Sequence, residues 1–403
     1  MEDHQDFENH PIPAAPLASD PGEIRPQVRS LRELIDLVSG RNVRSLEAAE
    51  DAGLAEVMPF PFMAVVGQVE MKMALLLAVI NPNIGGLLLI GPRGIGKTTA
   101  VRSLIGLLPE IRRSTCYYGC REEDVESGGL DAICPDCAQK FTEGKPLTKL
   151  DQVHLVELPL NSRLEDVIGG LDERALVHER LRLKRGILSQ ADQNILYIDE
   201  VNLLADEIID SILDAAAQGQ YTIRRGPISA TYKAQFTLIG SMNPEEGSLR
   251  PQIMDRFGLR VLVRGLENPQ ERQEVYQRVR SYRKNPRTLI SQFAPETEIA
   301  LKEIQAARRL LPQVELPDVV THAALELIRA LQIDSSRAEL TLLEAARAYA
   351  AADNRTNVAL EDIRVVAPMA LRLRRSAFMT RFFAERAQEE EELSTLITAK
   401  INP

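Results

Sequence analysis

A single loop motif constrains the fold of this chain more than any other feature of its sequence. Residues 91–98 read GPRGIGKT and fit the pattern G-x-x-x-x-G-K-[ST]. An apolar run (residues 86–90) precedes the motif and a helical pattern (residues 99–108) follows it, which is the context in which this pattern binds phosphate. Glycines let backbone N–H groups turn toward a phosphate, and the helix N-terminus adds the positive end of its dipole. The sequence therefore predicts a P-loop nucleotide site formed by Gly91, Pro92, Arg93, Gly94, Ile95, Gly96, Lys97, Thr98 and Thr99.

Polar side chains inside and beyond this loop predict the chemistry of an MgATP site. We expect Lys97 to neutralise the β- and γ-phosphate oxygens and Thr98 to ligate Mg²⁺. A second apolar run, Ile195–Ile198, leads directly into Asp199 and Glu200. We expect Asp199 to act on the magnesium shell, and Glu200 to orient or deprotonate the attacking water. An Asp-Glu pair at a strand end is also found as a merely solvated end, so the pair gains its specificity from the P-loop.

Three further residues are candidates for contact with phosphate. Asn243 follows the apolar run 236–241 and is a candidate sensor residue, the alternative being an Asn-Pro turn without nucleotide contact. Arg256 and Arg337 lie far from the P-loop in sequence. A guanidinium spreads positive charge over phosphoryl oxygens, and one supplied by a neighbouring subunit makes hydrolysis depend on assembly. Spacing alone explains either arginine equally well as a surface ion pair.

Short apolar runs alternate with helical patterns between residues 60 and 265. This alternation is typical of a mostly parallel sheet covered by helices. Around Arg225, Gly226 and Pro227, an alternating pattern predicts a β-hairpin that projects from the core. We therefore predict an α/β fold with helices on both faces of a mostly parallel sheet, with β-hairpin inserts. Its five strands are expected at residues 86–90, 153–160, 195–198, 236–241 and 259–263.

The first third of the chain predicts two segments ahead of the sheet. Residues 1–27 combine prolines with acidic and small residues and predict a disordered tail. Residues 28–55 show leucines and alanines at helical spacing and predict an N-terminal helical extension. The nucleotide-binding domain is expected at residues 56–265, with an inserted segment at residues 114–150.

The second half predicts a change from mixed to helical structure. Residues 169–172, of sequence GGLD, suggest a loop between two helices. Asn268 and Pro269 predict the start of a linker helix within residues 266–286, because they fit an N-cap followed by proline at the first helical position. Residues 287–403 predict a helical domain, interrupted at Pro312, Pro317 and Pro368.

The composition narrows the class of partner. The formal net charge of −10 disfavours nucleic acid, which proteins usually bind with a basic surface. We interpret a basic cluster at Arg372, Arg374, Arg375 and Arg381 as a solvated helix face or a subunit contact. No apolar run approaches the roughly 18 residues that a membrane span needs. The acidic first residues fit neither a secretory signal nor a transit peptide, so we expect a cytoplasmic protein.

All four cysteines fall in one segment, with three, thirteen and two residues between Cys116, Cys120, Cys134 and Cys137. A disulfide scaffold is disfavoured in a cytosolic chain without other cysteines. Four thiolates can close a tetrahedral site around a structural Zn²⁺, which would pin a segment that has little core of its own. The three-residue spacing of the first pair departs from paired C-x₂-C motifs. Free or redox-active thiols and an iron–sulfur cluster therefore stay open as alternatives.

Several segments resemble the magnesium chelatase I subunit family. They are the P-loop itself, residues 59–67 (PFPFMAVVG), 195–204 (ILYIDEVNLL), 243–258 (NPEEGSLRPQIMDRFG) and 338–347 (AELTLLEAAR). The resemblance extends over residues 60–375, and the 243–258 pattern is far more specific than a general ATPase motif.

The resemblance implies an AAA+ module with a helical lid, assembled into a hexameric ring with ATP between subunits. By motif, Arg256 resembles an arginine finger acting in trans, Arg337 the sensor 2 arginine and Asn243 the sensor 1 residue. Val66 and Gly67 resemble the segment on the adenine side. The family's ring docks on a D subunit and drives an H subunit, which inserts Mg²⁺ into protoporphyrin IX for (bacterio)chlorophyll synthesis. The resemblance thus implies a motor whose porphyrin site lies elsewhere.

Other functions fit the same residues. One is a chelatase-like chaperone of the MoxR type, which activates another metalloenzyme through a partner with a von Willebrand A-type domain. Another is a scaffold or switch that binds ATP without rapid turnover, which the intact Lys97, Asp199 and Glu200 disfavour. A helicase-like role is disfavoured by the acidic balance and by the lack of a recognisable DNA-binding module.

Overall fold

The computed structural model describes residues 58–116, 118–171, 183–225, 228–375 and 397. The tail and the helical extension predicted for residues 1–55 lie outside the described residues, as does nearly all of the chain beyond residue 375. The chain divides into two compact units, Met1–Val57 and Met58–Pro403. All of the elements described below belong to the second unit.

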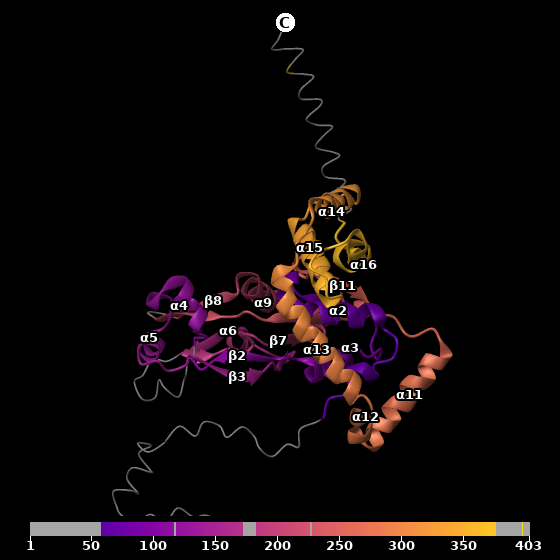
Figure 1. The fold of residues 1–403 in the computed structure, drawn as a ribbon, viewed down its shortest axis with the longest axis horizontal. Coiled ribbons are helices and arrows are strands. Elements are labelled where there is room, and N and C mark those ends of the chain that lie inside the picture. The colour runs from indigo at the N-terminus through magenta and orange to yellow at the C-terminus, as the bar shows by residue number, and fades with distance from the viewer. Residues whose placement is uncertain (1–57, 117, 172–182, 226–227, 376–396, 398–403) are drawn as a thin grey trace, which may run out of the picture. The chain divides into compact units, whose positions relative to one another are not determined.

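A five-stranded sheet forms the centre of this unit (Figure 1). Every pairing within it is parallel, and the strand order is β11-β1-β10-β7-β4. All five strands fall on the five apolar runs in the sequence, so the predicted α/β fold is confirmed. The strands are β1 (Leu87–Ile90), β4 (Leu155–Leu158), β7 (Ile195–Ile198), β10 (Thr237–Met242) and β11 (Leu259–Leu262).

Successive side chains of each strand point to opposite faces of the sheet and join two different hydrophobic clusters. Leu87 and Leu89 belong to one cluster, whereas Leu88 and Ile90 belong to the other. Burial on both faces explains why these strands are continuously apolar rather than alternating. The first cluster includes side chains of α2 (Val69–Ile80), α13 (Ala294–Leu310), α14 (Asp318–Ala330), α15 (Ser336–Ala352) and α16 (Leu360–Leu371), and the second those of α6 (Leu164–Ile168), α9 (Asp206–Gln218) and α10 (Pro251–Arg256).

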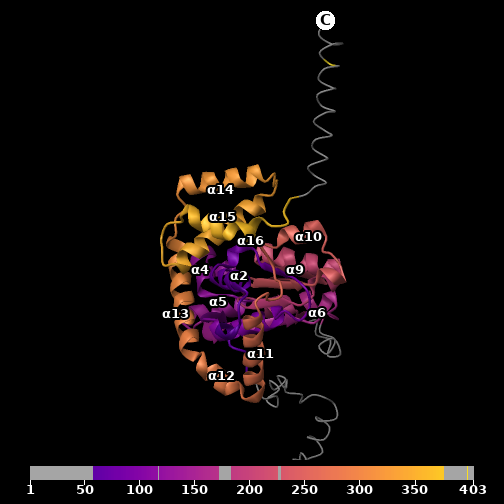
Figure 2. The same ribbon diagram turned by 90° about the vertical axis from the view of Figure 1, so that its right-hand side faces the viewer.

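A long connection joins the sheet to the C-terminal helices. Helix α11 (Pro269–Lys284) begins where predicted, because the Asn268 side chain accepts a hydrogen bond from the backbone N–H of Gln270. The short α12 (Pro286–Gln292) then leads into α13. Figure 2 shows α14, α15 and α16 gathered together, apart from α11 and α12. The proline at 368 does not interrupt its helix as expected: α16 continues through it, and the neighbouring Val366, Met369 and Ala370 are all buried. Their burial offsets the roughly 3 kcal/mol that an interior proline costs a helix.

Three antiparallel pairs project from the core. The predicted hairpin is present as β8 (Gln220–Arg225) and β9 (Ile228–Lys233). The expected loop at residues 169–172 is wrong in its described part, because β5 (Gly169–Leu171) pairs with β6 (Leu183–Arg185). Gly169 permits this pairing, since a Cβ there would lie 2.5 Å from the carbonyl oxygen of Lys184. The third pair, β2 (Glu110–Ser114) and β3 (Thr148–Gln152), flanks the cysteine segment.

Gly258 provides a direct test of this packing. A Cβ at Gly258 would lie 1.9 Å from the carbonyl oxygen of Ile84, a backbone atom that cannot rotate away. We expect Gly258→Ala to lower the free energy of unfolding by about 3 kcal/mol or more, because the core must shift to accept one methyl group. The measurement is the midpoint of urea or thermal unfolding. Gly106→Ala is the matched control, since nothing lies within 4 Å of a Cβ at Gly106. Equal midpoints for the two variants would contradict the packing described here.

Candidate functional site

A pocket of about 250 Å³ opens where β1, β7 and β10 end. Carboxyl ends of parallel strands meet at one edge of the sheet, so residues distant in sequence converge there. The structure thereby brings together nearly all of the residues that the sequence assigned to the phosphates, and their binding roles stay predictions. The lining residues are Arg93, Gly94, Ile95, Gly96, Lys97, Thr98, Thr99, Asp199, Glu200, Ser241, Met242 and Asn243.

The P-loop is held tightly against the sheet. The backbone N–H of Gly91 donates to the carbonyl of Met242 at 3.1 Å. A Cβ at Gly91 would lie 2.2 Å from the carbonyl oxygen of Val263, so only glycine fits. Lys97 is the first residue of α3 (Lys97–Ser103), and its Nζ donates to the carbonyls of Gly91 (2.6 Å) and Pro92 (2.8 Å). Burial lowers the pKa of Lys97, while the nearby carboxylates of Asp199 and Glu200 oppose that shift. A cation thus lies within the loop that is expected to receive phosphate.

Hydroxyl groups surround the carboxylate of Asp199. Thr98 Oγ1 donates to Asp199 Oδ2 at 3.1 Å, which joins the two predicted magnesium ligands directly. Tyr197 Oη donates to Asp199 Oδ1 at 2.9 Å, and Ser241 Oγ donates to the same oxygen. Ser241 Oγ also accepts from the backbone N–H of Glu200 at 3.2 Å. Sequence reasoning missed Tyr197 and Ser241, although each places a hydroxyl group in an otherwise apolar strand.

Glu200 has an unusual backbone and a cationic partner. Its φ of 52° lies in the left-handed region, which costs a non-glycine residue about 1–3 kcal/mol and is often found at functional sites. Arg93 of the P-loop approaches Glu200 Oε1 through Nη2 (3.1 Å) and Nε (3.2 Å), and it also pairs with Glu246. The Arg93 side chain is 67% exposed, so these ion pairs are screened by solvent and position the groups more than they stabilise the fold.

Asn243 lines the phosphate pocket and also caps a turn. Its Oδ1 accepts from the backbone N–H of Glu245 at 3.3 Å, which opens the 3₁₀ helix η6 (Pro244–Glu246). The side chain is buried, with the residue 3% exposed. The two interpretations drawn from the sequence are therefore compatible, because one amide both forms the Asn-Pro turn and faces the pocket.

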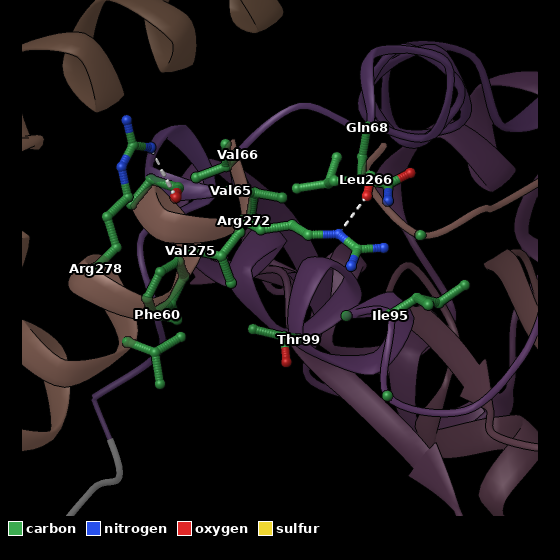
Figure 3. Close-up of a pocket in the computed structure, with 15 residues that line it drawn as sticks. Phe60, Val65, Val66, Gln68, Ile95, Thr99, Leu266, Arg272, Val275 and Arg278 are labelled. Carbon is green, nitrogen blue, oxygen red and sulfur yellow. Dashed lines mark hydrogen bonds between the residues drawn. The ribbon is translucent and has the colours of Figure 1, made fainter. Parts of the chain in front are cut away.

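A second, more apolar pocket of about 380 Å³ adjoins the first through the P-loop (Figure 3). Its walls include Val65 and Val66 on one side and Ile95 and Thr99 on the other, with Arg272 between them in this view. Helix α11 contributes Arg272, Val275, Arg278 and Val279, and Arg272 is fixed by donating to the carbonyl of Leu266 at 2.6 Å. An apolar slot beside a phosphate pocket suits a nucleotide base. Gly67 lies next to Val66 without lining the pocket; a Cβ there would lie 2.6 Å from Leu266 Cδ2.

The two candidate arginines lie together in a different pocket. Arg256 Nη1 is 2.7 Å from Asp214 Oδ1 and 3.5 Å from Asp210 Oδ1. Arg337 Nη1 is 3.7 Å from Asp255 Oδ2. Neither arginine is among the described residues that line the phosphate pocket of the same chain. Within one chain, the structure therefore separates the arginine pair from the P-loop.

The four cysteine sulfur atoms of Cys116, Cys120, Cys134 and Cys137 all lie within 4.8 Å of one another, and all four are free. Cys116 Sγ is 3.7 Å from Cys120 Sγ and 3.5 Å from Cys134 Sγ. Hydrogen bonding from the Cys120 thiol lowers the pKa of Cys116, which favours a thiolate there. A closed group of four sulfur donors is the type of site that holds structural zinc.

The cysteine segment is anchored to the β8–β9 hairpin. Lys233 of β9 pairs with Asp124 of α4 (Glu122–Gly128), and the rings of Tyr118 and Tyr232 stack with centroids 5.5 Å apart. Arg121 Nη2 lies 2.6 Å from Asp192 Oδ2. The segment is therefore packed onto the nucleotide-binding domain.

The parallel sheet, the P-loop after its β1 strand, the strand-end Asp-Glu pair and the C-terminal helices define a P-loop ATPase of the AAA+ class with a helical lid. Comparison with known proteins agrees, because residues 321–396 match the family described as AAA lid domain. Residues 169–267 match the family described as magnesium chelatase, subunit ChlI. This chain belongs to the magnesium chelatase subunit I family, as its relatives show.

The relatives cover most of the chain. A magnesium-chelatase subunit ChlI homolog from Methanocaldococcus jannaschii is 42% identical over 322 residues, or 79% of this chain and 87% of that protein. The magnesium-chelatase 38 kDa subunit of Acidiphilium rubrum is 41% identical over 317 residues, or 78% and 90%. A solved structure from Cytophaga hutchinsonii has 20% identity and a TM-score of 0.51, covering 78% of this chain and 84% of that one, and supports the fold alone.

The hydroxyl groups around Asp199 generate a prediction. Tyr197→Phe removes one donor to the carboxylate and leaves the ring in place. We expect the Mg²⁺ concentration for half-maximal ATP hydrolysis to rise about 3- to 10-fold, the equivalent of one hydrogen bond of roughly 1 kcal/mol. The measurement is a Mg²⁺ titration of ATPase activity at fixed ATP. Tyr276→Phe is the control, because Tyr276 is 64% exposed on α11. An unchanged Mg²⁺ dependence in Tyr197→Phe would show that its hydroxyl does not support a metal ligand.

Proposed function

We propose that this chain is the ATP-hydrolysing motor subunit of a magnesium chelatase, which drives Mg²⁺ insertion into protoporphyrin IX by partner subunits in (bacterio)chlorophyll synthesis. One observation carries the proposal. In a chain whose relatives are named as magnesium chelatase subunits, Lys97, the Thr98–Asp199 pair and Glu200 line a single pocket. We also propose that it works in the cytoplasm, as its sequence predicts.

Each residue has a distinct task in this proposal. The Lys97 ammonium exchanges its two carbonyl partners for β- and γ-phosphate oxygens, while Thr98 and Asp199 hold the Mg²⁺ that accompanies ATP. Glu200 orients the attacking water or takes its proton, and Asn243 contacts the water or the γ-phosphate. The base occupies the apolar pocket beside Val66 and α11.

Arg256 and Arg337 require a second copy of the chain. Because both lie away from their own P-loop, we propose that they reach the nucleotide of a neighbouring protomer. There, guanidinium groups would stabilise the charge that develops on the phosphoryl oxygens. A closed ring, which the resemblance implies to be a hexamer, supplies such a neighbour to every site. We further propose that the ring docks on the D subunit and acts on the H subunit.

Reconstitution tests this function directly. The chain is combined with D and H subunits, MgATP and protoporphyrin, and the fluorescence of Mg-porphyrin is followed. We expect the wild type to support metal insertion. Glu200→Gln should bind ATP with unchanged affinity and lose at least about 100-fold in hydrolysis and insertion, because only the water-activating group is removed.

The outcomes separate the candidate functions. Equal turnover in Glu200→Gln would contradict the role of this carboxylate. Wild-type ATP hydrolysis without metal insertion would contradict the chelatase function, and would favour the MoxR-type chaperone that activates another metalloenzyme. Tight ATP binding with no hydrolysis under any condition would favour the nucleotide-dependent switch.

We propose that Cys116, Cys120, Cys134 and Cys137 hold a structural Zn²⁺. The sulfur separations of 3.5 and 3.7 Å support this, because a tetrahedral zinc–thiolate site has sulfur atoms about 3.8 Å apart. The small cluster around these cysteines buries only Cys120, Ile133, Cys137 and Leu147 fully, too little apolar surface to hold the segment by itself. Zinc would supply the missing stability, with no part in hydrolysis.

Metal analysis tests the zinc proposal. We expect about one equivalent of zinc per chain in the purified protein, and its loss in the double variant Cys134→Ser/Cys137→Ser together with protection of this segment from proteolysis. Ser127→Ala, on the exposed side of α4, is the control and should keep the metal. Iron in place of zinc, or four thiols that react freely in the native protein, would contradict the proposal.

A further inference from the structure

The basic cluster that follows α16 is not the solvated face that its sequence suggested. Arg374 has a side chain that is 0% exposed, whereas its neighbour Arg375 is exposed and donates to Gln332 Oε1 at 3.0 Å. Arg372 pairs with Glu70 of α2 at 2.6 Å, and Arg381 lies outside the described residues. Of the described members of the cluster, one has therefore been placed deep in the protein.

The buried Arg374 binds the backbone on both sides of Arg256. Its Nη1 donates to the side chain of Asp255 (Oδ1, 2.7 Å) and to the carbonyl of the same residue (3.3 Å). Its Nη2 donates to the carbonyls of Phe257 (3.3 Å) and Gly258 (2.9 Å). Asp255 and Phe257 are the immediate neighbours of Arg256. One guanidinium from the end of the lid thus fixes the short segment that carries the candidate arginine finger.

The same group also connects to Arg337. The Asp255 carboxylate that Arg374 binds accepts two hydrogen bonds from Ser335 Oγ, at 3.2 and 3.1 Å, and lies 3.7 Å from Arg337 Nη1. Ser335 directly precedes α15, the helix on which Arg337 lies. A single carboxylate therefore joins the segment of Arg256 to the start of the helix that carries Arg337.

Electrostatics indicates that this arrangement is kept for position rather than for stability. Burial lowers the pKa of Arg374, and the Asp255 carboxylate opposes that shift. A second buried guanidinium, Arg260, lies within 3.5 Å of the same carboxylate, and burial followed by repulsion from Arg374 lowers its pKa to about 10. Two buried cations around one anion are costly to desolvate, and apolar residues of similar size would fill the space at lower cost. Apolar residues cannot hold three carbonyl oxygens in fixed directions, whereas a planar guanidinium can.

We propose that Arg374 is a positioning residue for ATP hydrolysis in trans: it sets Arg256 and Arg337 as one rigid pair that is presented to the nucleotide of the next protomer. The inference rests on the proposed function of those two arginines. Displacement of a charged group by about 1 Å is enough to cost on the order of 100-fold in rate, so loss of this anchor should lower turnover without changing the phosphate pocket of the same chain.

Variant chains alone give the first readout. We expect Arg374→Met to lower ATP turnover about 10- to 100-fold while its own affinity for MgATP stays within about 2-fold of wild type. Arg375→Met is the matched control one residue away and should behave as wild type. If circular dichroism shows that Arg374→Met does not fold, Arg374→Lys takes its place, since it keeps the charge and loses the fork that reaches several carbonyls at once.

Mixed assemblies give the decisive readout. Glu200→Gln chains are inactive in their own pocket and keep both arginines. When Arg374→Met is mixed with Glu200→Gln, intact pockets of the first face intact arginines of the second, so activity should exceed the sum of the separate chains by at least about 5-fold. Arg256→Ala mixed with Glu200→Gln is the reference arm and should be rescued in the same way.

The two arms distinguish the inference from the function on which it rests. If Arg256→Ala is not rescued by Glu200→Gln, the proposed action in trans is wrong. If Arg256→Ala is rescued and Arg374→Met is not, Arg374 acts only within its own chain, as a purely structural residue would, and the inference is overturned. Wild-type turnover in a folded Arg374→Met protein would overturn it equally.

Discussion

Three parallel strands carry the phosphate pocket, and their register decides which side chains meet there. Ile90 of β1 pairs with Met242 of β10, and Ile198 of β7 pairs with Gly240. The first pairing holds the start of the P-loop against β10, through the bond from Gly91 to Met242, and the second brings Asp199 beside Ser241. A slip of one residue would exchange the two faces of a strand and break both hydrophobic clusters. The packing that buries the core therefore also fixes the carboxylate, the hydroxyl and the loop in one place.

Much of this arrangement could be predicted because its signals are local. Strands such as Ile195–Ile198 are buried on both faces, so the sequence shows them as apolar runs. Asp199 and Glu200 directly follow such a run, and the carboxyl ends of parallel strands always meet at one edge of the sheet. The start of α11 was equally readable, since Asn268 and Pro269 cap it within two residues. Each of these features depends on neighbours in sequence or on a general rule of topology.

The rest depends on partners that are remote in sequence and therefore gave no local signal. Arg374 lies 119 residues from Asp255, and nothing near it distinguishes a buried arginine from the exposed Arg375. Gly169 begins a strand only because residues beyond Leu183 return to pair with it. Tyr197 and Ser241 become ligand supports only when β7 and β10 lie side by side. In each case the tertiary contact decides the role, and propensity has no part in it.

The connectivity of the chain gives a physical route between the two halves of an ATP site. A base in the apolar pocket would touch Val275 and Val279 of α11. That helix continues through α12 into α13, whose buried residues share one hydrophobic cluster with α15 and α16. Arg337 lies on α15 and Arg374 follows α16, so the lid that receives any displacement of α11 also holds the arginine pair. Closely packed helices move as units rather than deforming. On the proposed function, occupancy of one pocket would therefore change how that protomer presents its arginines to the pocket of its neighbour.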